Sequence, residues 1–124
     1  MNISSNNEFG KLKAVVIGRP DGANWPKDDP HFQTYWKFGA KGPAKFPYDL
    51  PAEIIAEVNE NIYNICDRLK EHDVEVVRPR STNWKTAFAT HDWACTGMNN
   101  LPMRETLITI GNKVIECPHI YRSK

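Results

Sequence analysis

The chain has 124 residues, of which 40% are hydrophobic, enough for one domain with a modest core. Its 16 basic and 15 acidic residues give a formal net charge of +1, so the composition lacks the single-sign excess typical of nucleic-acid or membrane binding. The sequence contains no apolar run of membrane-spanning length and no signal-peptide pattern at its start. We therefore expect a single domain, residues 1–124, that is cytoplasmic and binds neither nucleic acid nor membrane.

Cysteine usage indicates a reducing compartment. Cys66, Cys95 and Cys117 are odd in number and widely spaced, which favours reduced thiols over a disulfide framework. The histidines and cysteines lack the short paired spacing of metal sites. The glycines of residues 39–42 lack the pattern of a phosphate-binding loop. We expect neither a metal nor a cofactor.

The first predicted element is a buried strand at Leu12–Gly18, an apolar run closed by glycine. Turn residues follow at Arg19–Gly22. Because functional groups are often mounted where a strand ends, Arg19 is a candidate for facing a ligand. The alternative is an ordinary surface ion pair with a carboxylate.

The segment from Pro20 to Pro51 is rich in proline, glycine and aromatic residues. A disordered linker is usually poor in aromatics, so we expect this segment to pack onto the core. Its interleaved aromatics and lysines also allow base stacking with single-stranded nucleic acid, which the balanced charge disfavours.

A long helix is predicted at Pro51–His72, with Pro51 in its first turn and Asp49 as a possible cap. Basic residues crowd its last turns, where they suit the helix dipole. The predicted apolar face consists of Ile54, Ile55, Val58, Ile62, Ile65, Cys66 and Leu69.

A second strand is predicted at Asp73–Pro79. The order strand, long helix, strand indicates a crossover between two parallel strands. Residues Arg80–Asn100, which carry several aromatics, are expected to form a loop.

The final element is a β-hairpin. Thr106–Ile110 and Lys113–Cys117 are β-branched and apolar, and only Gly111-Asn112 separates them. These two residues tolerate the positive φ of a primed turn. Pro118 removes a backbone donor and so ends the second strand.

Taken in order, these segments resemble the glycine amidinotransferase family from about Ser4 to Lys124. The matching motifs are Asn7-Glu8-Phe9 before Val15–Arg19, the aromatic patch Tyr35–Phe38, Phe46-Pro47 before the helix, Val-x-Val-x-Arg-Pro at 74–79, and Arg104-Glu105 leading to Gly111-Asn112 and an Arg-Ser-Lys tail. That family has the pentein α/β propeller fold. The resemblance implies an α/β protein with a partial pentein fold: strand, long helix, strand and C-terminal β-hairpin, matching the family's N-terminal portion.

The resemblance also implies a chemistry. In the family a cysteine attacks the guanidino carbon of arginine, and a histidine paired with an acidic residue handles the protons. Those groups belong to later parts of the propeller. Cys95 and Cys117 do not match the nucleophile's context, and Cys117 stands where the family has a small residue. We therefore expect no catalytic residue in this chain.

One substrate-binding position carries over by resemblance. The family's acidic residue after arginine, at the start of the hairpin, holds the planar guanidinium through paired hydrogen bonds. Here that residue is Glu105, with Arg104 and Asn99 as further candidates. Glutamate in place of aspartate moves the carboxylate one methylene outward, and an exposed Arg-Glu pair is the alternative interpretation. A second departure is Asp73 at the helix exit, where the family commonly has glycine.

We thus expect an amidinotransferase-like protein whose parent reaction transfers an amidino group from arginine to an amine through an amidino-cysteine. By itself the chain is expected to be inactive and to bind arginine or a guanidino compound weakly. The exposed hairpin further predicts a homo-oligomer, with Leu107, Ile110 and Val114 between chains. The alternatives are a non-catalytic α/β binding or assembly module, and a fragment of a guanidine-hydrolysing pentein such as arginine deiminase.

Overall fold

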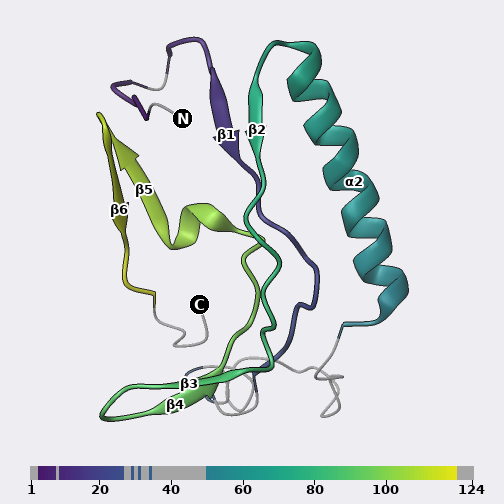
Figure 1. Ribbon diagram of the computed structural model, residues 1–124, viewed down its shortest axis with the longest axis vertical. Helices are drawn as coiled ribbons and strands as arrows, with labels where there is room; N and C mark the ends of the chain where they lie inside the picture. Colours follow the sequence, from purple (N-terminus) through teal and green to yellow (C-terminus); the bar gives the residue numbers. More distant parts are fainter. Residues whose placement is uncertain are drawn as a thin grey trace.

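The computed structural model describes residues 3–7, 9–26, 29, 31, 34 and 50–119. The expected aromatic patch at 35–38, Phe46 and the possible cap Asp49 lie outside the described residues, as does the tail from 120. The elements, in chain order and as labelled in Figure 1, are β1 (Ala14–Val16), α2 (Ala52–Glu71), β2 (Glu75–Val77), β3 (Ala87–Ala89), β4 (Ala94–Thr96), the 3-10 turn η1 (Met103–Glu105), β5 (Leu107–Ile110) and β6 (Lys113–Glu116).

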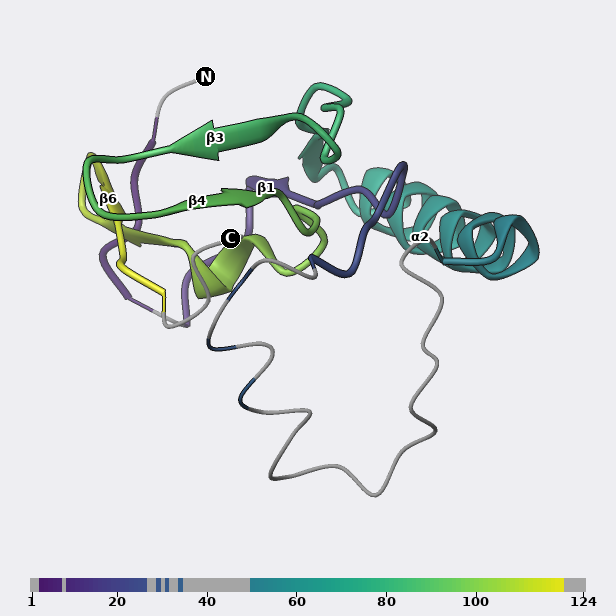
Figure 2. The ribbon, with the colours of Figure 1, turned by 90° about the horizontal axis from the view of Figure 1, so that it is seen from below.

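Strands β1 and β2 form a parallel pair, with Val15 opposite Val76, and α2 makes the connection between them. This arrangement confirms the predicted crossover. The hydrogen bonding continues past the assigned strands, because Ile17 donates its N–H to the carbonyl of Val77 at 3.0 Å. In Figure 1, α2 lies along β2, and the hairpin β5–β6 lies on the other side of β1. Seen from below in Figure 2, α2 projects to one side of the molecule and the hairpin β3–β4 to the other.

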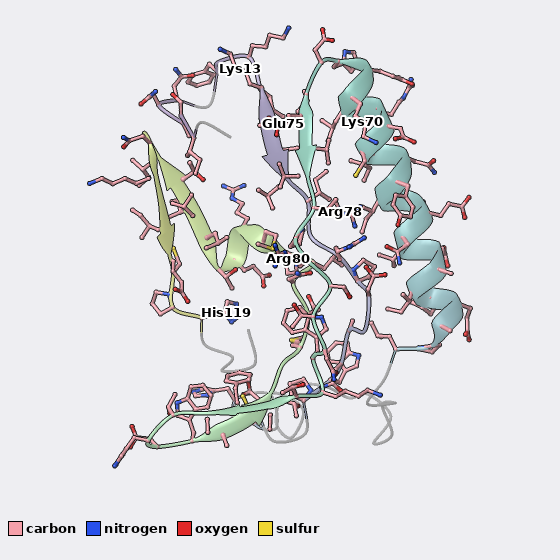
Figure 3. All side chains as sticks on the ribbon, viewed as in Figure 1. Lys13, Lys70, Glu75, Arg78, Arg80 and His119 are labelled. Atoms are coloured by element: carbon pink, nitrogen blue, oxygen red, sulfur yellow. The ribbon has the colours of Figure 1, made fainter. Side chains whose placement is uncertain are left out.

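Helix α2 packs on the strands through a narrower stripe than the sequence predicts. Ile62 and Cys66 are buried on α2, and Val74 is buried just before β2. Ile54 and Ile65, which were assigned to the same apolar face, remain 42% and 54% exposed. Two short strands offer one helix only a limited apolar surface, so the flank of the predicted face is left uncovered. Beyond β2, Arg78 contacts the same helix, where its Nη1 lies 3.6 Å from the Cys66 Sγ (Figure 3).

Both ends of α2 lie within a residue of the prediction. Pro51 is the N-cap, with φ −54° and ψ 141°, and so precedes the first turn instead of belonging to it. At the other end, His72 is the C-cap and donates its N–H to the carbonyl of Leu69 at 3.1 Å. Lys70 donates to Asp67 at 2.9 Å. That hydrogen bond, together with the coulombic attraction of the same carboxylate, raises the pKa of Lys70.

Asp73 follows the helix with φ 61°, the left-handed conformation that glycine adopts most easily. This is the position at which, by the resemblance, the family commonly has glycine. We expect Asp73→Gly to raise the free energy of unfolding by about 0.5 kcal/mol, because the strain of a side chain at positive φ is removed. Urea denaturation followed by circular dichroism would measure this change. The matched control is His72→Gly, next to it at φ −99°, which should lower stability instead. Equal effects at both positions would contradict the conformational explanation.

Residues Arg80–Asn100 are not wholly a loop, and that prediction was wrong. They contain an antiparallel hairpin in which Phe88 of β3 lies opposite Cys95 of β4. Three of the six strand residues are alanine and only Thr96 is β-branched, so the sequence gives little signal for these strands. Cys95 is 1% exposed, and the rings of Phe88 and Trp93 meet edge to face at 5.6 Å.

Asn24 attaches the segment after β1 to this hairpin. Its side chain is buried and donates from Nδ2 to the Gly97 carbonyl at 2.9 Å, while its backbone N–H donates to the Met98 carbonyl at 2.8 Å. A buried amide is stabilising only when its hydrogen bonds are made, and here they join segments far apart in sequence. The path of the chain from β4 toward η1 is therefore fixed against β1.

The predicted C-terminal hairpin is confirmed, with its strands shortened to β5 and β6. Only Gly111 of the turn pair has positive φ, at 58°, which is the pattern of a type II′ turn. The backbone of Ser5 bonds Gly111 in both directions, at 2.8 and 2.7 Å. Within the described part of the chain, no helix is long and apolar enough to cross a membrane.

Candidate functional site

The predicted substrate-binding residues lie in the segment 99–105, which runs from beside the end of β1 to the start of β5. Glu105 ends the 3-10 turn η1, where its N–H donates to the Pro102 carbonyl at 3.1 Å. Thr106 follows and bonds the Met103 carbonyl through both its N–H, at 3.2 Å, and its hydroxyl, at 3.3 Å. Pro102 before the turn and the strand after it leave Glu105 little backbone freedom.

The segment leading into η1 crosses directly over the end of β1. A Cβ built on Gly18 would lie 2.0 Å from the carbonyl oxygen of Asn100 and 2.3 Å from that of Leu101. The Asn100 side chain completes the contact by accepting the N–H of Arg19 at 3.0 Å. Glycine is thus needed at position 18 for close approach of two backbones. This contact sets where η1, and with it Glu105, stands relative to the parallel strands.

The Glu105 carboxylate lies beside the side chain of His119. Nε2 of His119 lies 3.6 Å from Oε2 of Glu105. The histidine side chain is 18% exposed and the glutamate side chain 45% exposed, so the carboxylate is open to solvent beside a largely buried ring. Figure 3 shows His119 beyond the end of β6, on the side of η1. Sequence reasoning missed His119, because it considered the histidine only for metal spacing.

The other predicted site residues are placed differently. Arg104 and Glu105 are both exposed, and no ion pair joins the two side chains within the described residues, so their interpretation as an exposed pair stays an alternative. Asn99 accepts the N–H of Leu101 on its Oδ1 at 3.0 Å, which shapes the crossing segment. Its role toward a substrate stays a prediction.

Arg19, the candidate at the end of β1, forms an ion pair. Its Nε lies 3.1 Å from Oδ2 of Asp21, and Oδ1 of the same carboxylate accepts a hydrogen bond from Asn59 of α2 at 3.0 Å. The ion-pair interpretation of Arg19 is confirmed. Asn59 thus connects α2 to the turn after β1.

Cysteines and metal ligands do not gather at the site. All three cysteines are thiols without a disulfide, and Cys66 and Cys95 are buried. Among the described residues, no group of three His, Cys, Asp or Glu side chains is arranged to hold a metal ion. Cys117 is joined to the backbone next to Glu105, because its N–H donates to the Thr106 carbonyl at 2.8 Å.

Comparison with known proteins finds amidinotransferases that are similar to nearly the whole of this chain. The chain is 34% identical to the mitochondrial glycine amidinotransferase of Xenopus laevis and 33% identical to that of Gallus gallus, in each case over 98% of this chain and 29% of the relative. It is 27% identical to inosamine-phosphate amidinotransferase 1 of Streptomyces glaucescens, over 98% of this chain and 36% of the relative. The chain thus spans about a third of the length of the curated relatives that it matches. No family model matches it.

Two solved structures of amidinotransferases are also similar to this chain. An inosamine-phosphate amidinotransferase from Streptomyces griseus superposes with a TM-score of 0.86 at 25% identity, over 98% of this chain and 35% of that one. An amidinotransferase of the saxitoxin biosynthetic pathway from Microseira wollei gives a TM-score of 0.71 at 25% identity, over 94% of this chain and 32% of that one.

The fold and the position of Glu105 define a partial pentein-type α/β protein with an acidic residue at the start of its C-terminal hairpin. The chain is homologous to the glycine and inosamine-phosphate amidinotransferases over nearly its whole length, in keeping with the expected N-terminal portion of such an enzyme.

Proposed function

We propose that this chain supplies the guanidinium-holding carboxylate of an amidinotransferase-type site through Glu105. The observation that supports this proposal is the half-exposed carboxylate, held at the start of β5 by a turn whose backbone is bonded on both sides. A guanidinium presents parallel N–H groups that match the two oxygens of one carboxylate. The parent reaction would be transfer of an amidino group from arginine to an amine, through an amidino-cysteine and without a metal or cofactor.

The proposed ligand is arginine or a simpler guanidino compound, bound weakly because one carboxylate forms only part of a pocket. In a titration with arginine, we expect the amide signals of residues 104–107 to shift progressively, with a dissociation constant on the order of millimolar. Heteronuclear NMR of the labelled chain would measure the shifts. Glu105→Gln, which removes the charge and keeps the shape, should abolish them.

The matched control for that titration is Glu116→Gln on β6, which removes a charge from the other strand of the same hairpin. It should leave the arginine-induced shifts unchanged. Shifts of equal size in Glu105→Gln and the unaltered chain would show general cation binding and contradict the assignment of Glu105.

We further propose that the chain alone does not catalyse the parent reaction, because its cysteines do not match the family's nucleophile. Cys95 is buried, and Cys117 is engaged in the hairpin backbone. A buried thiol in apolar surroundings behaves as a packing group. Purified chain incubated with arginine and glycine should release no ornithine above the buffer blank in an amino-acid assay. Turnover that disappears in Cys95→Ala or Cys117→Ala would overturn this proposal.

The second candidate function is a non-catalytic assembly module. The observation that favours it is the exposed face of the hairpin that carries Ile108, Ile110 and Ile115, which are 43–57% exposed and which share that face with Lys113, the cross-strand partner of Ile110. Monomers rarely leave a large apolar patch open to water. In a solution of the purified chain, the apolar surface available to cover this face is that of a second copy, so we propose a two-fold dimer.

A cytoplasmic location is likewise a proposal, and the vertebrate relatives are named as mitochondrial. The homologues found are amidinotransferases, which favours that family over a guanidine-hydrolysing pentein.

A further inference from the structure

The contact between His119 and Glu105 joins the segment that follows β6 to the segment that precedes β5. Nε2 of the histidine and Oε2 of the glutamate are 3.6 Å apart. With 18% of its side chain exposed, the imidazole is mostly enclosed by protein, whereas the carboxylate is 45% exposed. A largely buried ring is held by its packing, so it is the more fixed partner of the two.

The backbone that carries His119 is held in register with the backbone that carries Glu105. Leu107 lies opposite Glu116 in the β5–β6 ladder, and one step further the Cys117 N–H donates to the Thr106 carbonyl at 2.8 Å. Pro118 then fixes its own φ and starts the departure from the strand. The hairpin therefore brings His119 to Glu105 through its own hydrogen bonds, independently of any ligand.

We propose that His119 is a positioning residue that orients the Glu105 carboxylate for a guanidinium. This inference rests on the proposed function of Glu105. Glutamate has one more rotatable bond than the aspartate of the family pattern, so ordering its side chain costs more conformational free energy. Contact at Oε2 selects among the rotamers before the ligand arrives. It also sets the plane of the carboxylate, on which paired hydrogen bonds to a planar guanidinium depend.

The first test uses the full chain without ligand. In His119→Phe, which keeps a planar ring and removes the ring nitrogens, we expect the carboxyl carbon of Glu105 to change its NMR chemical shift. Its two γ protons should also approach each other in shift as the rotamers average. His119→Gln places an amide N–H near the position of Nε2 and should restore native-like values. This rescue separates orientation of the carboxylate from mere filling of space.

The matched control is His91→Phe. His91 also lies beside a carboxylate, with its Nδ1 3.0 Å from Oδ1 of Asp92, but both side chains are almost fully exposed at the tip of β3–β4. This substitution should leave every Glu105 signal in place. Unchanged amide signals of β5 and β6 in each variant would verify that the hairpin remains folded. If His119→Phe loses those signals, the comparison of His119→Gln with His119→Asn, whose amide is too short to reach, gives the same test.

The second test titrates each variant with methylguanidine. We expect His119→Phe to weaken binding about tenfold, equivalent to about 1.4 kcal/mol, and His119→Gln to weaken it less than about threefold. In a Glu105→Gln background, His119→Phe should cause no further loss, because a positioning residue acts only through the group that it positions.

The possible outcomes distinguish this proposal from the proposed function. Glu105 signals that are unaffected by His119→Phe would overturn the positioning role, whatever the ligand does. An equal loss of affinity in the Glu105→Gln background would also overturn it. If the Glu105 signals respond to His119→Phe as expected but the unaltered chain shows no binding, the positioning role stands and the guanidinium-binding function of Glu105 fails.

Discussion

Replacing Gly18 by alanine is expected to lower the free energy of unfolding by about 3 kcal/mol, the upper part of the range for overpacking a well-filled site. The added Cβ would lie 2.0 Å from one backbone carbonyl oxygen and 2.3 Å from the next. Both atoms belong to the backbone of the segment that leads into η1, so neither can rotate away as a flexible side chain would. Urea denaturation followed by tryptophan fluorescence would measure the loss.

The same substitution should also disturb the proposed site. Relief of the clash requires the segment at Asn100 and Leu101 to move away from β1, which carries η1 and Glu105 with it. We therefore expect the amide signals of η1 to shift and the arginine response to weaken. Gly10→Ala is the control, because its Cβ would meet only the Asn7 side chain, at 3.2 Å, and stability should change by less than about 0.5 kcal/mol. Equal losses at Gly18 and Gly10 would contradict the close-approach explanation.

The chain is expected to sediment as a dimer at micromolar concentration, and Ile110→Lys is expected to convert it to a monomer. Ile110 is 57% exposed and shares one face of the hairpin with Ile108 and Ile115. Burying an isoleucine side chain contributes about 1.5–3 kcal/mol, so a few such side chains from each copy can hold a dimer. A lysine at position 110 would lie opposite Lys113 on the same face, so in a dimer its ammonium would lose hydration beside a like charge. Sedimentation velocity would measure the change in mass.

The hairpin register supplies the control for this experiment. Thr109 lies on the opposite face of β5, paired with Val114, so Thr109→Lys adds the same charge to the same strand and should leave the dimer intact. The register also divides the residues expected at the interface, because Leu107 and Val114 lie on the Thr109 face while Ile110 lies on the other. A native chain that sediments as a monomer would overturn the dimer proposal, because the isoleucine face would then not be covered by a second copy.

Elements with a strong local pattern could be predicted from the sequence. The helix has an apolar period and a proline start, so its ends are within a residue of those expected. The C-terminal hairpin has β-branched strands and a Gly-Asn turn, and it forms with Gly111 at positive φ. The hairpin β3–β4 has neither feature, and its strands are stabilised by long-range contacts such as those of the buried Cys95 and Asn24. A pattern of three-residue strands rich in alanine is too short to indicate pairing.

By itself, the sequence determined the crossover of two parallel strands, the hairpin, the left-handed exit of the helix and the acidic residue of the proposed site. The helix and the hairpin depend on residues within a few positions of one another, so local periodicity and turn chemistry specify them. The order of strand, helix and strand indicated the crossover, and the resemblance to the family singled out Glu105 and Asp73. Only the tertiary structure decided that the segment before η1 crosses over Gly18 and that His119 lies beside Glu105. Those contacts join residues that are distant in the chain, and their identity depends on strand register and backbone packing, for which the sequence carries no period.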